Sequence, residues 1–281
     1  MSAGLLEAIQ NQTGKVISLA SEYENNPEVA IHEIRKCFKR MRSVAALLKP
    51  VNPDSANTWN TLWRDCSRSL SQGRELCVRV NSILALTTKP GQYRSLLDLA
   101  ISKRNEILNK MSGDGTITRL ADTIEKSGNN LATLIPDDLH FYHLEQGLSR
   151  AFEKAKNQLD ICISSANPGD LHELRKRCKR LQYHTELLSG LDSEIKTLNR
   201  SISNSTELLG VYNDMQDLCC WASSSEEIHA FDEWYMLKEQ LQIKKNTIRK
   251  RALNHILQLL KNDTTDYLEL YTDIYHDMNE Q

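Results

Sequence analysis

Two stretches of the chain repeat the same alternation of apolar positions, at steps of three and four residues. The first contains Ile31, Ile34, Phe38, Met41, Ala45 and Leu48. The second contains Leu171, Leu174, Cys178, Leu181, Thr185 and Leu188. This spacing is typical of an amphipathic helix that packs its apolar side in a helical bundle. It predicts two helices that dock in the same way.

Similar periodicity, interrupted by Gly, Pro and Asn, predicts helical segments along most of the chain. The predicted segments are Gly4–Tyr23, Pro27–Lys49, Ser55–Leu86, a helix ending near Met111, a helix starting near Asp138, and helices at about Asp192–Trp221 and Glu226–Lys261. The weaker pattern at Thr116–Asp138 predicts a connection between two halves. Asp170 and Glu173 have the spacing of a capping box that opens the second basic helix, which is predicted to end at Ser189 and Gly190.

Composition favours helix over sheet and places the protein in the all-α class. Aromatic residues make up 6% of the 281 residues and there are 6 prolines, while Leu, Ala, Glu, Lys, Arg and Gln dominate. The 7 cysteines lack the spacing of a disulfide framework or zinc ribbon. No basic leader or apolar run of about 20 residues is visible. These features predict a cytoplasmic protein without a membrane anchor.

Charge is segregated although the net charge is only −2. The tail from Asp263 onward carries acidic charges only, whereas IHEIRKCFKRM from Ile31 and LHELRKRCKRL from Leu171 carry the same cations 140 residues apart. At about 100° per residue, these cations form a stripe well separated from the apolar positions. Few acids lie nearby to neutralise them, so an internal repeat of this kind predicts an anion-binding surface.

Both stretches resemble the conserved histidine α-helical domain (CHAD) family, whose hallmark is a helix of the form HxxRKxxKRxR in two copies. Gln182 replaces the usual Arg in the second copy, and Gly73–Arg74–Glu75 resembles the family's Arg-Asp element with Glu in place of Asp. Arg150 and Lys154 lie where the family tends to place further cations. The predicted site residues are His32, Arg35, Lys36, Lys39, Arg40, Arg42, Arg150, Lys154, His172, Arg175, Lys176, Lys179, Arg180 and Tyr183.

The resemblance implies two four-helix bundles related by pseudo-two-fold symmetry around a basic cavity or pore. It also implies a single domain spanning residues 1–281, built from half-repeats of about 1–135 and 136–281. The implied ligand is inorganic polyphosphate, with an association with polyphosphate granules. The lysines are expected to act as adaptable point charges, the arginines to form forked hydrogen bonds to phosphate, and His32 and His172 to donate to phosphate and gain charge beside it.

Several alternatives stay open at this stage. Nucleic acid or another phosphorylated ligand would also be attracted to a basic surface, although few aromatic residues near the two stretches are available for base stacking. A polyphosphate-processing enzyme would need metal-binding carboxylates or an activated nucleophile, and no such pattern is visible. A metal site at the two histidines is disfavoured because the surrounding cations would repel a metal ion. The sequence therefore predicts no metal or other cofactor, and the lack of a catalytic pattern predicts no enzymatic activity. The tryptophans are expected in the core, and Arg74, Glu75 and Asp214 are expected to form structural polar pairs.

Overall fold

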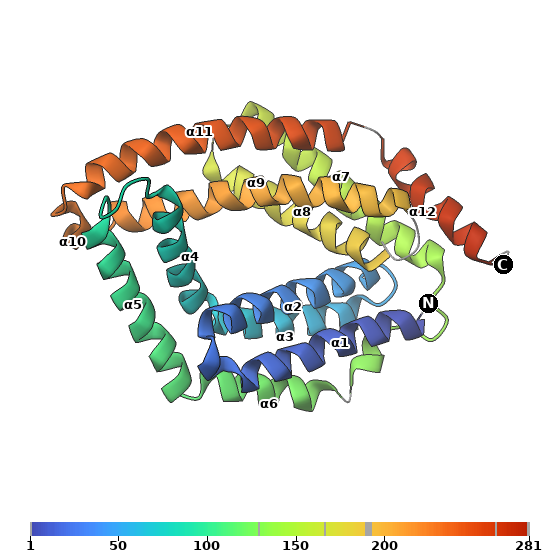
Figure 1. Ribbon diagram of the computed structural model, residues 1–281. Helices are drawn as coiled ribbons and strands as arrows, with labels where there is room; N and C mark the ends of the chain where they lie inside the picture. The colour runs from blue at the N-terminus through green and yellow to red at the C-terminus, as the bar shows by residue number, and fades with distance from the viewer. Residues whose placement is uncertain (1, 129, 166, 189–192, 262, 280–281) are drawn as a thin grey trace.

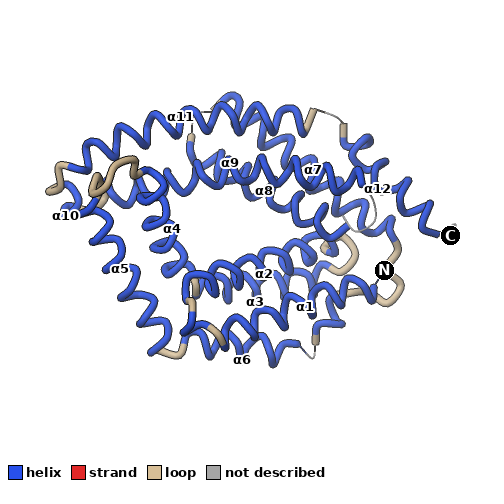
Figure 2. The backbone as a smooth tube through the Cα atoms, viewed as in Figure 1, coloured by secondary structure: helices blue, strands red, loops and turns tan. Residues whose placement is uncertain are grey.

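Every regular element in the described part of the chain is a helix, which confirms the all-α class (Figures 1 and 2). The computed structural model describes residues 2–128, 130–165, 167–188, 193–261 and 263–279. Its helices up to residue 134 are α1 (Ser2–Ser21), η1 (Tyr23–Asn25), α2 (Pro27–Leu48), α3 (Pro53–Ser69), α4 (Ser71–Leu86), α5 (Arg94–Gly113), α6 (Thr116–Gly128) and η2 (Leu131–Leu134). The later helices are α7 (Phe141–Ser164), α8 (Pro168–Leu188), α9 (Ser193–Ser223), α10 (Glu226–His229), α11 (Glu233–Leu259) and α12 (Thr264–Asn279).

The two basic stretches form α2 and α8, and both helices begin at a proline. The Asn26 side chain caps α2 by accepting a hydrogen bond from the Val29 amide at 3.3 Å. Helix α8 begins at Pro168, two residues before the predicted capping box. Asp170 instead accepts a hydrogen bond from the Ser165 hydroxyl at 2.5 Å. The end predicted at Ser189 and Gly190 lies outside the described residues.

Three predicted segments differ from the structure. The segment 55–86 is divided at Leu70, whose backbone angles of −95° and 2° interrupt the helix between α3 and α4. The segment 226–261 is divided into α10 and α11. The connection predicted after residue 116 contains the regular helix α6, because Ile117, Leu120 and Ile124 form a buried stripe on it. Helix α6 packs against α1.

The apolar stripes of α2 and α8 are buried in one large core, as their spacing predicts. All twelve stripe positions are buried, including Thr185, whose hydroxyl bonds to the Leu181 carbonyl and lies 3.1 Å from the Tyr271 hydroxyl of α12. In Figure 1, α1, α2, α3 and α6 form the lower part of the molecule and α7, α8, α9 and α11 the upper part. Helices α2 and α8 approach each other toward their C-terminal ends.

A second, smaller core joins elements that are distant in sequence. Residues of α4 and α5 pack there against α9, α10 and α11, around buried Trp234. Trp59 and Trp63 are buried in the large core, as expected. Trp221 is only partly buried, and the Arg79 guanidinium lies 5.3 Å from the centre of its ring. Through α4, this second core anchors one wall of the pocket described next.

Candidate anion-binding site

The basic sides of α2 and α8 line a shared pocket of about 400 Å³, here called the central pocket. Helices α4 and α9 complete its walls. Seven lysine or arginine side chains line it, against two glutamates. The lining residues are His32, Arg35, Lys36, Lys39, Arg40, Arg74, Arg175, Lys179, Gln182, Tyr183, Glu186, Asn199, Ser203 and Glu207. The pocket therefore has a strong excess of positive charge.

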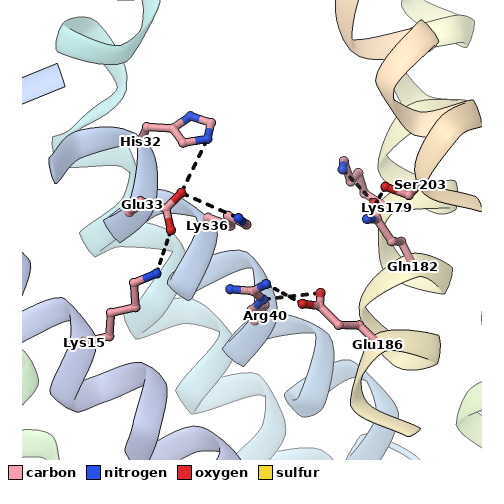
Figure 3. Close-up of polar contacts among 9 residues, drawn as sticks. All are labelled: Lys15, His32, Glu33, Lys36, Arg40, Lys179, Gln182, Glu186 and Ser203. Carbon is pink, nitrogen blue, oxygen red and sulfur yellow. Dashed lines mark hydrogen bonds and ion pairs between the residues drawn. The ribbon is translucent and has the colours of Figure 1, made fainter. Parts of the chain in front are cut away.

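On the α2 side, two cations are held by neighbouring groups. The Arg35 guanidinium donates to the Ser67 carbonyl and, at 3.0 Å, to the Ser71 hydroxyl. These bonds tie α2 to the junction between α3 and α4. Lys36 lies 3.6 Å from Glu33, whose carboxylate also accepts a hydrogen bond from Lys15 at 2.7 Å (Figure 3). Because Glu33 already has this closer partner, it neutralises Lys36 only in part.

On the α8 side, neutral polar groups hold Lys179 in place. The Lys179 ammonium donates to the Gln182 side-chain oxygen at 2.7 Å, and the Gln182 amide donates to the Ser203 hydroxyl at 3.1 Å (Figure 3). The Nε of Arg175 is buried and has no hydrogen-bond partner among the described residues. An unpartnered buried donor of this kind is costly unless a ligand or water satisfies it.

One ion pair spans the pocket between the two basic helices. The Arg40 guanidinium of α2 donates to the Glu186 carboxylate of α8, with Nε and Oε2 3.3 Å apart (Figure 3). Both side chains are more than half buried, with 25% and 35% of their surfaces exposed. The pair holds the two helices together and places a negative charge at the edge of the pocket.

The cations of the central pocket repel one another in the absence of an anion. Burial, followed by the charges of Arg175 and Arg35, lowers the pKa of Lys39 to about 7. Burial and the charge of Arg175 likewise lower the pKa of Lys179 to about 8, although Glu207 and Glu186 oppose this shift. Lysine normally titrates near 10.4. The pocket therefore destabilises its own positive charge, which a bound anion would relieve.

The two repeated histidines occupy different surroundings. His32 lines the central pocket, and burial together with the charge of Arg74 lowers its pKa. His172 does not line the pocket; its Nδ1 lies 2.8 Å from the Asn213 amide nitrogen, and burial and Lys176 lower its pKa. Lys176 also lies outside the lining and pairs with Glu173 at 3.3 Å. Of these repeated positions, His32 and Lys36 therefore belong to the lining of the central pocket, and His172 and Lys176 do not.

Four other predicted residues also lie outside the central pocket. The Arg42 Nε donates to the Asn60 side-chain oxygen at 3.0 Å on α3. Arg150, Lys154 and Arg180 line a separate pocket between α2, α3, α7 and α8. The helical angles place Arg42 in the same stripe as Lys39, but they do not show which neighbouring helix receives each side chain.

Arg74 is a cation of the lining that the sequence prediction did not include among the site residues. It lines the central pocket from α4, although Arg74 and Glu75 with Asp214 were expected to form buried structural polar pairs. Glu75 lies 3.7 Å from Arg79 instead. Burial raises the pKa of Asp214, and the charges of Arg74 and Arg175 oppose this increase. The Gly73–Arg74–Glu75 motif was the available signal, but its interpretation depended on the break at Leu70.

No three His, Cys, Asp or Glu side chains in the described ranges gather in a group that could hold a metal ion. Within the same ranges, none of the helices has the length and apolar character needed to span a bilayer.

The fold and pocket define an all-helical protein with two basic helices facing a shared cavity. A family model described as the CHAD domain matches residues 6–223, so the chain belongs to the CHAD family. The chain is also similar to the crystal structure of the CHAD domain from the plant Ricinus communis. Sequence identity is 18% and the TM-score is 0.63, covering 94% of this chain and 92% of that chain. At this low sequence identity, the structural similarity shows that the two proteins share a fold. A search of the curated proteins finds no match.

Proposed function

We propose that this protein binds inorganic polyphosphate in the central pocket without chemically changing it. The observation that supports the proposal is the lining of seven cations against two glutamates, contributed by both basic helices and by α4. Phosphate oxygens accept strong charge-assisted hydrogen bonds from arginine and lysine. A polymer with a negative charge on each unit would satisfy many of these donors at once.

The arrangement suits an extended anion better than a small one. The lining residues of α2 extend from His32 to Arg40, which at 1.5 Å per residue corresponds to about 12 Å along the helix. Arg175 and Lys179 face the same pocket from α8. A single phosphate would reach only part of this surface, whereas successive phosphates of a chain would contact both sides.

Nucleic acid is the alternative ligand with the same backbone chemistry. Tyr183 is the only large aromatic side chain among the lining residues described, and the Lys179 ammonium lies 5.9 Å from its ring centre. Single-strand binding generally depends on aromatic surfaces on which successive bases stack. The pocket therefore favours a polyanion without bases, with weak competition from nucleic acid.

A competition titration tests this assignment. Labelled long-chain polyphosphate bound to the protein is displaced with unlabelled polyphosphate, pyrophosphate, ATP or single-stranded DNA, each at equal total charge. We expect unlabelled polyphosphate to compete at least tenfold better than the others. If DNA displaced the labelled chain as well as unlabelled polyphosphate did, the pocket would bind polyanions without preference. If ATP displaced it better than polyphosphate did, the pocket would be a nucleotide site.

Binding without turnover is a separate part of the proposal. Hydrolysis assisted by metal ions would require carboxylates that hold the metal beside the phosphate. The two glutamates of the lining are Glu186, which is bonded to Arg40, and Glu207, which lies near the Ser203 hydroxyl at 3.4 Å. We expect no phosphate release from polyphosphate incubated with the protein and Mg²⁺. Release that follows the protein concentration would show that the protein is an enzyme.

The proposed organisation is one domain in which half-repeats of about 1–135 and 136–281 form two four-helix bundles around a pseudo-two-fold axis. The repeated basic helices support it, and an experimental structure with polyphosphate would test it.

We place the protein in the cytoplasm, in association with polyphosphate granules. Fluorescence of a tagged copy should be punctate in polyphosphate-rich cells and diffuse in cells without polyphosphate; unchanged diffuse fluorescence would contradict granule association.

A further inference from the structure

A second basic pocket lies between α2, α3, α7 and α8, and is called here the Arg180 pocket. Its volume is about 220 Å³, and it shares no lining residue with the central pocket. Four cations and two asparagines provide its donors, and no carboxylate belongs to its described lining. The lining residues are Ala45, Ala46, Lys49, Ala56, Asn57, Asn60, Gly147, Arg150, Ala151, Lys154 and Arg180.

The crossing of α2 and α8 separates the two pockets. Here the His184 Nε2 lies 3.0 Å from the Ser43 carbonyl oxygen, and both residues are buried. Along α2, the lining of the central pocket ends at Arg40 and that of the Arg180 pocket begins at Ala45. A buried hydrogen-bonded contact therefore lies between the two groups of cations, and a ligand in one pocket does not occupy the other.

The internal repeat explains why this pocket keeps its charge. Arg180 corresponds to Arg40 in the first repeat, and Ala46 corresponds to Glu186 in the second. Arg40 is bonded to the Glu186 carboxylate. Ala46 lines the Arg180 pocket where the repeat has Glu186, and the carboxylate whose charge acts on Arg180 is Glu173, which pairs with Lys176 and Arg177.

The α7 side of the pocket adds charge and rigidity. When GLSRAF at Gly147–Phe152 of α7 is aligned with GLLEAI at Gly4–Ile9 of α1, Arg150 and Lys154 correspond to Glu7 and Asn11. Gly147 brings α7 so close to α2 that a Cβ atom there would lie 2.4 Å from the Leu47 carbonyl oxygen. Burial and the charges of Arg177 and Arg180 lower the pKa of Lys154. The cations are thus held close together on a firmly packed wall.

We propose that the Arg180 pocket is a second anion site that binds one or two phosphate groups, through Lys49, Arg150, Lys154 and Arg180. Its volume of about 220 Å³, compared with about 400 Å³ for the central pocket, suits one or two phosphate groups. Two sources present the same chemistry: free phosphate or pyrophosphate, and the end of a polyphosphate chain. The site does not rest on the function proposed for the central pocket, because none of its lining residues belongs to that pocket.

Substitution of Ala46 by Glu tests the proposal by recreating the Arg40–Glu186 pair at Arg180. Pyrophosphate is titrated calorimetrically into the full chain and into Ala46→Glu, with thermal unfolding as the check on folding. We expect the variant to lose one pyrophosphate site, or about tenfold in its affinity, as when a charge-assisted hydrogen bond is lost. Ala46→Gln adds the same bulk without the charge and should retain most of the binding.

Two further titrations assign the ligand and separate the sites. If Ala46→Glu weakens pyrophosphate but leaves long-chain polyphosphate unchanged, the ligand is a free small phosphate; if it weakens both, the pocket holds chain ends. Pyrophosphate binding here should survive when the cations of the central pocket are reversed. Equal pyrophosphate affinity and stoichiometry in the wild type and Ala46→Glu, or equal losses in Ala46→Glu and Ala46→Gln, would overturn the proposal.

Discussion

The two basic helices carry nearly the same cations but present them differently. Helix α2 contributes five basic residues to the lining of the central pocket, between His32 and Arg40. Helix α8 contributes the cations Arg175 and Lys179, followed by neutral and acidic side chains. The counterparts of His32 and Lys36 lie outside the lining. A repeated sequence therefore predicts a repeated chemistry only where the neighbouring helices are also equivalent.

The difference arises at a few neighbouring positions. Glu186 on α8 satisfies Arg40, whereas Ala46 on α2 leaves Arg180 without a corresponding partner. Gln182 replaces the arginine found at position 42 and bonds to Lys179. These exchanges concentrate the large positive surface on one side of the α2–α8 crossing and leave a smaller positive pocket on the other. The two repeats therefore line two basic pockets of different size.

The largest expected effect comes from reversing equivalent lysine pairs in the two helices. Lys36→Glu with Lys39→Glu should weaken polyphosphate binding about a hundredfold or more, because both side chains line the central pocket. The double variant Lys176→Glu with Lys179→Glu should weaken polyphosphate binding only about tenfold, because Lys176 lies outside the lining. Titrations of both variants measure the difference. Equal losses would mean that the two repeats act equivalently after all.

Removal of the Glu186 charge should strengthen polyphosphate binding. Glu186→Gln would free Arg40 for a phosphate oxygen and remove a repelling carboxylate, giving about a threefold to tenfold gain in affinity. Glu173→Gln is the matched control, since Glu173 pairs with Lys176 and Arg177 away from the central pocket. A loss of affinity in Glu186→Gln would show that the ion pair positions α2 and α8 for binding.

Affinity should fall as the pH rises above neutrality. Burial beside Arg175 and Arg35 lowers the pKa of Lys39 to about 7, and that of Lys179 is about 8. A bound polyanion would raise both, so binding takes up protons above pH 7. We expect about a tenfold loss of affinity between pH 6.5 and 8.5, which corresponds to an average uptake of about half a proton on binding over these two pH units. Lys39→Arg should flatten the profile; an unchanged profile would exclude Lys39 as the source.

The smallest expected effect is on stability. Lys39→Met removes a cation that burial and neighbouring arginines disfavour, and should raise the free energy of unfolding by about 1 kcal/mol at pH 6. Because the folded-state pKa of Lys39 is lowered, the unfolded state binds the proton more strongly, and wild-type stability rises as the pH increases from about 7. The gain should therefore shrink at higher pH.

Lys36→Met is the control for this stability measurement. Its side chain is 41% exposed, so we expect almost no change in the free energy of unfolding. Urea denaturation of both variants at pH 6 and pH 9 gives the comparison. Destabilisation by Lys39→Met at pH 6 would contradict the repulsion inferred for the central pocket.

The sequence predicted the orientation of the basic helices well because one helix determines its own apolar stripe. Residues such as Ile34 and Leu174 recur at the helical period, and both are fully buried. The opposite stripe then follows from helical geometry alone. For this reason Lys39 and Lys179 were found before the fold was known.

The sequence did not predict the features of the site that depend on how several helices pack together. The break at Leu70 separates α4, which carries Arg74 into the lining, from α3, but no proline stands at the break and Gly73 follows it by three residues. Arg42 donates a hydrogen bond to Asn60 of α3, and Arg180 lines a pocket together with residues of α7. The periodicity of one helix does not show which neighbouring helices its side chains meet. The segment 116–128 was predicted to be part of a connection and not a regular helix, because its buried stripe contains only Ile117, Leu120 and Ile124.

The most direct test of the central claim is the salt dependence of polyphosphate binding in a variant with Arg35, Lys39, Arg175 and Lys179 all changed to Glu. A control with Arg94, Lys126, Lys250 and Arg251 changed to Glu has the same net charge, with substitutions at exposed positions outside both pockets. We predict that the first variant loses affinity and that its slope against log salt falls by about 0.7 for each cation removed, while the control keeps most of both. Unchanged affinity and slope in the folded pocket variant would contradict the account.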